Sequence, residues 1–242
     1  MWPQGFSLEA YKTLFANSDT LNGFYVSVSR SVIGTAATMF VSCMAAYAIT
    51  KGNVPGVRFA RKFFVFTMYF GGGLVPYYIV VKSLGLVGTF LVYIIPALVS
   101  VFGVIIIRAF IESLPPALEE SAMIDGANEI VIFWKILFPM CMPIVAAISM
   151  FTFVGQWNSF FDTMLFNFMN RELYTLQFYL YMILTSKAVS LQDAQEMGKA
   201  VTTNSQTITM AVTVITILPI LIIFPFIQRY FRSGLLIGAI KA

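Results

Sequence analysis

Residues that could perform catalysis or bind a metal are scarce in this chain, and its acidic side chains gather in one stretch. Histidine, the commonest general base and zinc ligand, does not occur. Cys43 and Cys141 lie within apolar runs, where they are expected to pack as small hydrophobic residues. Five of the eleven acidic residues lie between Glu112 and Glu129. An enzyme built on zinc or a Ser/His pair is therefore disfavoured, and the acidic segment calls for another explanation.

The composition indicates the environment that holds these residues. Hydrophobic residues make up 59% of the chain, charged residues only 11%, and the mean hydropathy is +0.83. In a typical soluble domain about a quarter of the residues are charged. The sequence is therefore that of an integral membrane protein.

Uncharged runs define the expected membrane spans. A helix needs roughly 20 apolar residues to cross the hydrocarbon region, where each charge costs about 3 kcal/mol. The runs lack the alternation of barrel strands and are too long for them. The sequence thus predicts an all-α polytopic membrane protein with a membrane domain over 23–229. Its five spans are expected at about 23–50, 62–82, 86–111, 139–161 and 206–229.

The distribution of Lys and Arg predicts which loops face the cytoplasm. In the loops, nine lie on the side of the acidic segment and five on the opposite side. Short cytoplasmic loops carry an excess of Lys and Arg. The segment 115–135 and the tail 230–242 are therefore expected in the cytoplasm. The N-terminal segment 1–22 and the long loop 162–205, which contains a short amphipathic helical stretch, are expected outside.

Two features inside the spans have open interpretations. Arg30, near the outer end of the first span, either snorkels or pairs with a neighbour, or it contacts a solute. The run Gly71, Gly72, Gly73 weakens the second span, and such irregular backbone persists where it is buried in protein or lines a cavity. Close helix packing and a translocation path both remain open. The first span is rich in small residues and is expected to be buried within a bundle.

A polar and aromatic cluster ends the fourth span. It consists of Gln156, Trp157, Asn158 and Asp162. These side chains can contact a hydroxyl-rich solute by stacking and hydrogen bonding, and they equally suit an interfacial belt. The cluster is therefore a candidate solute path, with the interfacial alternative left open.

The acidic segment is expected to form a helix, a glycine bend and a second helix along the membrane surface. Pro115 and Pro116 suit the first positions of a helix, because their missing amide hydrogens would be unpaired there anyway. Gly126 is placed to end this helix. A second helical segment is expected from Ala127 to Lys135, leading into the membrane at Pro139.

This segment resembles the EAA motif, E-A-A-x-x-x-G-x(9)-I-x-L-P, of permease subunits in binding-protein-dependent ABC importers. The matching positions run from Glu120 through Gly126 and Ile136 to Pro139. Ser121 replaces the first alanine of the motif, and Phe138 replaces the leucine before its proline. The segments WNSFFD, YTLQFYLY and SGLLIGAIKA are similar to the carbohydrate branch of this family, the permeases related to maltose-type importers.

The resemblance implies a type I importer fold and a subunit with no chemistry of its own. The implied partners are a second permease subunit in a heterodimer, two ABC ATPase subunits and an extracytoplasmic solute-binding protein. ATP and magnesium would be bound by the ATPases, with no cofactor in this chain. The residues expected to couple to an ATPase are Glu120, Ser121, Ala122, Asp125 and Gly126.

The family also implies a bacterial-type plasma membrane and a first span upstream of the sequence given. The transported solute would be a sugar or an oligosaccharide. The alternative is a secondary carrier or channel driven by an ion gradient. Such proteins carry ionisable residues within their spans, and here Arg30 is the one candidate.

Overall fold

The computed structural model describes residues 18–52, 54–185, 210–211, 213–222 and 224–225, and the regular structure in these ranges is helical. Predictions that concern residues 1–17, 186–209 and 226–242 lie outside the described residues. These include most of the N-terminal segment, part of the long loop and the tail. The all-α expectation is confirmed for the described residues.

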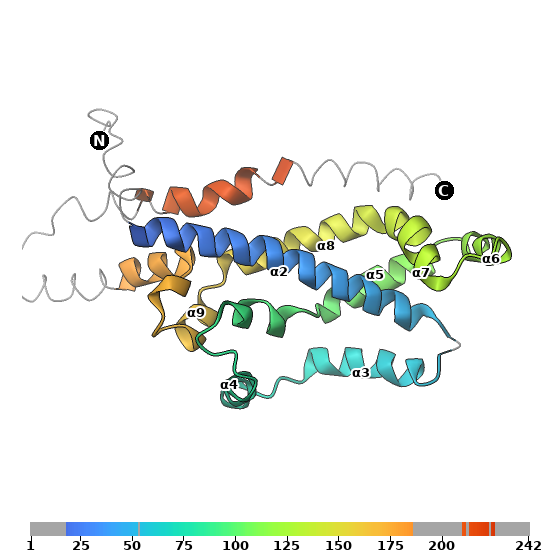
Figure 1. Ribbon diagram of the computed structural model, residues 1–242, viewed down its shortest axis with the longest axis horizontal. Coiled ribbons are helices and arrows are strands. Elements are labelled where there is room, and N and C mark those ends of the chain that lie inside the picture. Colours follow the sequence, from blue (N-terminus) through green and yellow to red (C-terminus); the bar gives the residue numbers. More distant parts are fainter. Residues whose placement is uncertain (1–17, 53, 186–209, 212, 223, 226–242) are drawn as a thin grey trace, which may run out of the picture.

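Three apolar helices form the core of the bundle. α2 (Ser18–Thr50) runs along its whole length and packs on α5 (Val101–Glu112) and α8 (Phe138–Asn158), as Figure 1 shows. The buried face of α2 includes several small residues, so the prediction of a closely packed first span is confirmed. Gly34 and Gly103 lie where helices approach one another, and a Cβ at Gly103 would lie 3.0 Å from the Ile148 side chain.

The expected spans are present as continuous helices only in part. Among the described residues, two helices are long and apolar enough to cross a membrane, Ser18–Thr50 and Glu129–Asn158. A third candidate consists of Phe90–Ala97 and Val101–Glu112, which are bent by 44°. In the expected fifth span the described part includes a short apolar helix, Thr213–Ile222. The count of five spans stays a prediction.

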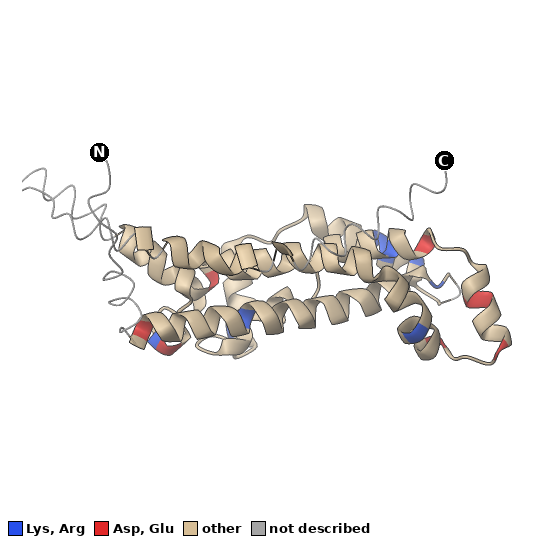
Figure 2. Cartoon of the chain, turned by 90° about the horizontal axis from the view of Figure 1, so that it is seen from above, with Lys and Arg blue, Asp and Glu red and all other residues tan. Residues whose placement is uncertain are grey.

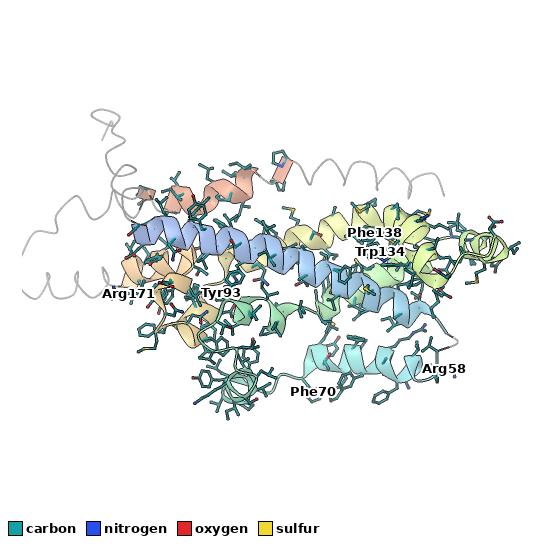
Figure 3. The ribbon with its side chains drawn as sticks, in the orientation of Figure 1. Arg58, Phe70, Tyr93, Trp134, Phe138 and Arg171 are labelled. Atoms are coloured by element: carbon teal, nitrogen blue, oxygen red, sulfur yellow. The ribbon has the colours of Figure 1, made fainter. Side chains whose placement is uncertain are left out.

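The segment expected as a second span is interrupted at its glycines. α3 (Val57–Tyr69) runs along the bundle, with Arg58 and Phe70 marking its two ends in Figure 3. α4 (Leu74–Ser83) is seen end-on in Figure 1 and so lies across the bundle axis. Gly73 has φ +85°, which an L side chain rarely adopts. The predicted weakening by the glycine run is therefore confirmed, since the helix is interrupted between α3 and α4.

The acidic segment forms α6 (Ala117–Ile124), which begins directly after Pro116. The expected second helical segment is present, although it begins at Glu129 and not at Ala127. α7 (Glu129–Val131) and the π-helical turn η3 (Ile132–Leu137) continue without a break into α8. The widened π turn directly precedes Pro139, which has no amide hydrogen to donate to the preceding turn.

The end of the bundle opposite α6 is built from short elements. They are the 3-10 turns η1 (Phe90–Tyr93), η2 (Ile95–Ala97) and η4 (Arg171–Leu173), the helix α9 (Phe161–Phe166), and a helix over Leu176–Thr185. The last of these falls in the stretch predicted to be helical within the long loop. Most charged residues lie near the two ends of the bundle, as Figure 2 shows, which is the distribution expected of a chain that spans a membrane.

Candidate coupling and solute sites

α6 ends in a glycine turn whose amides donate hydrogen bonds to two carbonyls of its last turn. The amide of Gly126 donates to the Met123 carbonyl at 3.0 Å, and the amide of Ala127 donates to the Ala122 carbonyl at 3.0 Å. This pair of bonds is the Schellman motif, which requires a left-handed residue. Gly126 has φ +80° and supplies it. The predicted helix end at Gly126 is therefore confirmed.

α6 lies across one end of the bundle and turns most of its acidic residues outward. It is seen end-on in Figure 1 and crosses the long axis in Figure 2. Ala122 is 7% exposed and packs in the core cluster next to η3. Glu120, Ser121 and Asp125 are exposed. The five residues expected to couple to a partner are thus together in space, with Ala122 holding the helix and the polar residues free to be contacted.

The two small residues after Glu120 have different environments. Ser121 points to solvent, where a hydroxyl costs nothing, and Ala122 fills a position next to Ile132 and Phe133 in the core cluster. Phe138, the second departure from the motif, is partly buried, and its ring lies tilted against that of Trp134 with centroids 5.1 Å apart (Figure 3). Its aromatic ring therefore finds aromatic neighbours within its own helix.

Lys51 joins α6 to two other elements. It follows the last residue of α2, and its Nζ lies against the carboxylate of Glu119 in α6 and 2.9 Å from Oε2 of Glu129 in α7. The hydroxyl of Tyr47 donates to the same oxygen of Glu129, and Lys51 lies over the Tyr47 ring at 4.6 Å. A cavity of about 800 Å³ adjoins this cluster.

The charge of Lys51 is stabilised by these neighbours. Burial opposes the charged form, but hydrogen bonds with the two carboxylates and the tyrosine outweigh that penalty and raise the pKa of Lys51 above its ordinary value. The lysine therefore stays protonated throughout the physiological range. Because its partners come from α6 and α7, the ammonium connects the end of α2 to both.

Arg61 of α3 caps the same end of α2 by hydrogen bonding to its last carbonyls. Its Nε donates to the Ile49 carbonyl at 2.7 Å and an Nη donates to the Thr50 carbonyl at 3.1 Å. A cation suits the negative end of a helix dipole, where the last carbonyls have no helical partners. Arg61 also lies 3.9 Å from Glu112 at the end of α5. The end of α2 next to α6 is thus a meeting point of α3, α5, α6 and α7.

Arg30 is at the centre of a second polar cluster, near the other end of the bundle. It is only 2% exposed. Its Nε donates to Gln156 Oε1 at 2.8 Å, one Nη donates to the Ser159 carbonyl at 3.2 Å, and the other Nη donates to the carboxylate of Asp162. The guanidinium also lies 4.6 Å from the centre of the Tyr93 ring. Of the readings open for Arg30, pairing with a neighbour is the one the structure confirms.

The Arg30 cluster forms one wall of a cavity. The cavity has a volume of about 440 Å³ and lies between α2, α5 and α8. Arg30 and Gln156 line it together with the hydroxyl side chains of Thr38, Ser100 and Thr152. The hydroxyl, amide and guanidinium groups around this cavity can exchange hydrogen bonds with a hydroxyl-rich solute.

The other two residues of the predicted outer cluster have different environments. Trp157 is 1% exposed, and its indole N–H donates to the Thr216 carbonyl at 2.8 Å. Its ring therefore packs inside the bundle, away from the cavity. The side chain of Asn158 accepts a hydrogen bond from Gln177 at 3.2 Å on the exposed surface. Of the predicted cluster, Gln156 and Asp162 come together around Arg30, whereas Trp157 and Asn158 do not.

Sequence reasoning missed Lys51 and Tyr93 as members of these sites. Lys51 was grouped with the other loop cations by side of the membrane. Tyr93, labelled in Figure 3, is 1% exposed, and its hydroxyl donates to the Leu173 carbonyl at 2.6 Å. A lysine directly after a long apolar run, facing an acidic segment on the same side, is the signal that could have identified Lys51.

An apolar helical bundle with a polar helix across one end and a polar cavity near the other defines a membrane transport protein as the class. Residues 38–237 match the family described as the binding-protein-dependent transport system inner membrane component. Because the match covers most of the chain, the chain belongs to this family. It is a permease subunit of an ABC importer, a transport component without catalytic activity of its own. Such a subunit works in a complex with a binding protein and an ATPase.

Two relatives from Bacillus subtilis (strain 168) cover nearly the whole chain. The polygalacturonan/rhamnogalacturonan transport system permease protein YtcP is 38% identical over 99% of this chain and 83% of its own length. Protein LplC is 39% identical over 100% of this chain and 81% of its own length. A crystal structure of a bacterial ABC transporter that imports the acidic polysaccharide alginate matches with a TM-score of 0.82 and 26% identity, covering 96% of this chain and 82% of the matched chain.

Proposed function

We propose that this subunit translocates a sugar or oligosaccharide delivered by an extracytoplasmic binding protein, and that α6 receives the movement of an ATPase in the cytoplasm. The carbohydrate assignment is supported by the names of the relatives, which include transporters of polygalacturonan and alginate. In the proposed complex the chain pairs with a second permease subunit of similar fold and with two ATPase subunits. The acidic end and the C-terminus face the cytoplasm.

One observation carries the coupling role. α6 is fixed to the bundle by buried Ala122 and by the Gly126 turn, and it presents Glu120, Ser121 and Asp125 outward at the extreme end of the molecule. A short helix held in this way can be contacted by a partner, and it passes the displacement through its turn to the α7–α8 helix. ATP binding would thereby bias the bundle between two arrangements.

The solute path is proposed to pass the 440 Å³ cavity. Arg30 and Gln156 line it, Asp162 holds the Arg30 guanidinium through an ion pair, and the hydroxyl groups of further lining residues offer hydrogen bonds. Trp157 and Asn158 follow Gln156 in the chain but bond to Thr216 and Gln177 and are not among the lining residues. The proposed path therefore presents polar groups among apolar ones, as a sugar with hydroxylated and apolar faces requires.

Replacing Gly126 with valine tests the coupling role. A side chain at φ +80° costs about 1–2 kcal/mol of backbone strain, while the space around Gly126 is open. We expect Gly126→Val in the assembled complex to reorient α6 and to reduce both solute uptake and solute-stimulated ATP hydrolysis about tenfold. The measurements are uptake into proteoliposomes and phosphate release.

Gly52→Val is the matched control, since Gly52 is exposed, has open space around it and does not adopt a positive φ. It should behave as the wild type. Normal uptake and normal ATP hydrolysis in Gly126→Val would contradict the coupling role. The ion-driven carrier alternative is tested by purification in mild detergent, because the importer proposal fails if no ATPase subunit accompanies the chain.

A further inference from the structure

Two different kinds of contact connect α6 to the rest of the bundle. Ala122 packs against the apolar side of η3, and the Gly126 turn continues directly into α7, so α6 is linked to α8 by packing and by the chain itself. Within the described residues, the ion pair that α6 makes with α2 is Lys51–Glu119. A displacement of α6 can therefore reach α8 without Lys51. The apolar cluster that holds Ala122 also includes residues of α2, and the Lys51–Glu119 ion pair adds a direct polar contact between α6 and the end of α2.

We propose that Lys51 is a positioning residue through which α6 moves α2 during the transport cycle. This inference rests on the proposed coupling role of α6. Its distinguishing feature is the double contact of Nζ with Glu119 and with Glu129, which lies 2.9 Å away at the start of the α7–α8 helix. The ammonium thus senses the angle between α6 and that helix and transmits it to the end of α2.

α2 carries this movement to the cavity. Arg30 lies in α2, 21 residues before Lys51, which directly follows the last residue of this helix; the separation is roughly 30 Å at 1.5 Å per residue. At that end Arg30 contacts Gln156 of α8, which lines the cavity, and Asp162 of α9. A charged side chain near each end of α2 therefore contacts the helix Glu129–Asn158: Lys51 contacts Glu129, and Arg30 contacts Gln156.

The partial exposure of the Lys51–Glu119 pair suits a contact that positions a helix but is not required for folding. The side chains of Lys51 and Glu119 are 19% and 25% exposed, so water screens the pair and its contribution to folding is small. The fold at this end rests on the apolar cluster that includes Ile132, Phe133 and Leu137. Removing the charge of Lys51 should therefore leave the complex assembled while loosening the connection of α6 to α2.

The test is Lys51→Met in the full complex, reconstituted with its ATPase and binding protein. We expect normal amounts of assembled complex and retained ATP hydrolysis, with solute uptake per ATP hydrolysed reduced about fivefold or more. Lys51→Arg keeps the charge and should restore the ratio. Lys62→Met is the matched control, because Lys62 is an exposed lysine of the neighbouring α3 that enters no ion pair among the described residues.

A second set of variants keeps the inference testable if Lys51→Met assembles poorly. Glu119→Gln removes the partner charge and should reduce the same ratio, and combining it with Lys51→Met should add little, because both act on one contact. An unchanged ratio in Lys51→Met, an equal loss in Lys62→Met, or fully additive losses in the double variant would overturn the inference. If Gly126→Val uncouples the complex and Lys51→Met does not, only the role of Lys51 fails; if neither changes uptake, the proposed function fails as well.

Discussion

At the scale of single residues, the informative side chains are charged groups placed in low-dielectric surroundings. Arg30 has a nearly buried side chain, 3% exposed, and it is accompanied by the carboxylate of Asp162, which is 30% exposed. Removing one member of such a pair leaves the other unpaired, and this costs more than the pair contributes. The amide of Gln156 and the carbonyl of Ser159 satisfy further guanidinium hydrogens.

This asymmetry gives a prediction for Asp162. We expect Asp162→Asn to lower the thermal stability of the purified complex, because about 2 kcal/mol is lost when a buried cation loses its counter-charge. Combining it with Arg30→Met, which removes the cation, should recover part of that loss. The measurement is the unfolding midpoint of the detergent-solubilised complex.

Asp125→Asn serves as the control for stability, since Asp125 is exposed and enters no ion pair among the described residues. It should leave the midpoint unchanged. A double variant at Arg30 and Asp162 that is less stable than Asp162→Asn alone would show that the arginine stabilises the bundle by packing and not through its charge.

At the scale of elements, close approach of helices depends on small residues. Gly34 of α2 faces Gln156 of α8, and a Cβ there would lie 3.2 Å from the Gln156 side chain. Without a hydrophobic driving force between helices in lipid, such contacts supply much of the attraction by dispersion. The glycine therefore sets the distance between α2 and α8 beside the cavity.

Gly34→Val should move α2 away from α8. We expect the overpacking to cost about 1–3 kcal/mol of stability and therefore to lower the unfolding midpoint of the complex. We also expect it to reduce solute uptake, because Gln156 is held between Gly34 and Arg30. Gly155→Val is the matched control for stability, since a Cβ at Gly155 meets nothing within 4 Å. Equal midpoints for the two variants would contradict close packing at Gly34.

At the scale of the whole molecule, the two polar clusters lie toward opposite ends of one bundle. The Lys51 cluster adjoins α6, and the Arg30 cluster adjoins the short elements near α9. α2 and the helix from Glu129 to Asn158 run between them. A change at one end can therefore reach the other through two rigid elements, which is the arrangement that alternating access requires.

The proposed orientation predicts opposite accessibility for the two ends. Met169, which is 93% exposed beyond α9, is expected outside, and Asp125 is expected in the cytoplasm. In intact cells a membrane-impermeant maleimide should label Met169→Cys, whereas Asp125→Cys should react only after permeabilisation. The wild-type chain provides the background, because Cys43 and Cys141 are buried. The reverse labelling pattern would invert the assignment of sides.

The sequence by itself determined the features that depend on local chemistry. Apolar runs require helices in lipid, a glycine run weakens the helix that contains it, and Gly126 stops α6 because only glycine adopts φ +80° without strain. The motif spacing around Glu120 likewise indicated the family. By contrast, the sequence did not predict the π-helical turn before Pro139, which lies within the continuous helix from Glu129 to Asn158.

Only the tertiary structure decided which charges meet. Arg30 and Asp162 are 132 positions apart, and Lys51 and Glu119 are 68 apart, so no local periodicity links either pair. Their contacts follow from how α2 packs on α5 and α8, which depends on the summed fit of many small and apolar side chains. For the same reason Trp157, although next to Gln156 in sequence, faces the bundle interior and donates to Thr216, because successive helical residues point about 100° apart.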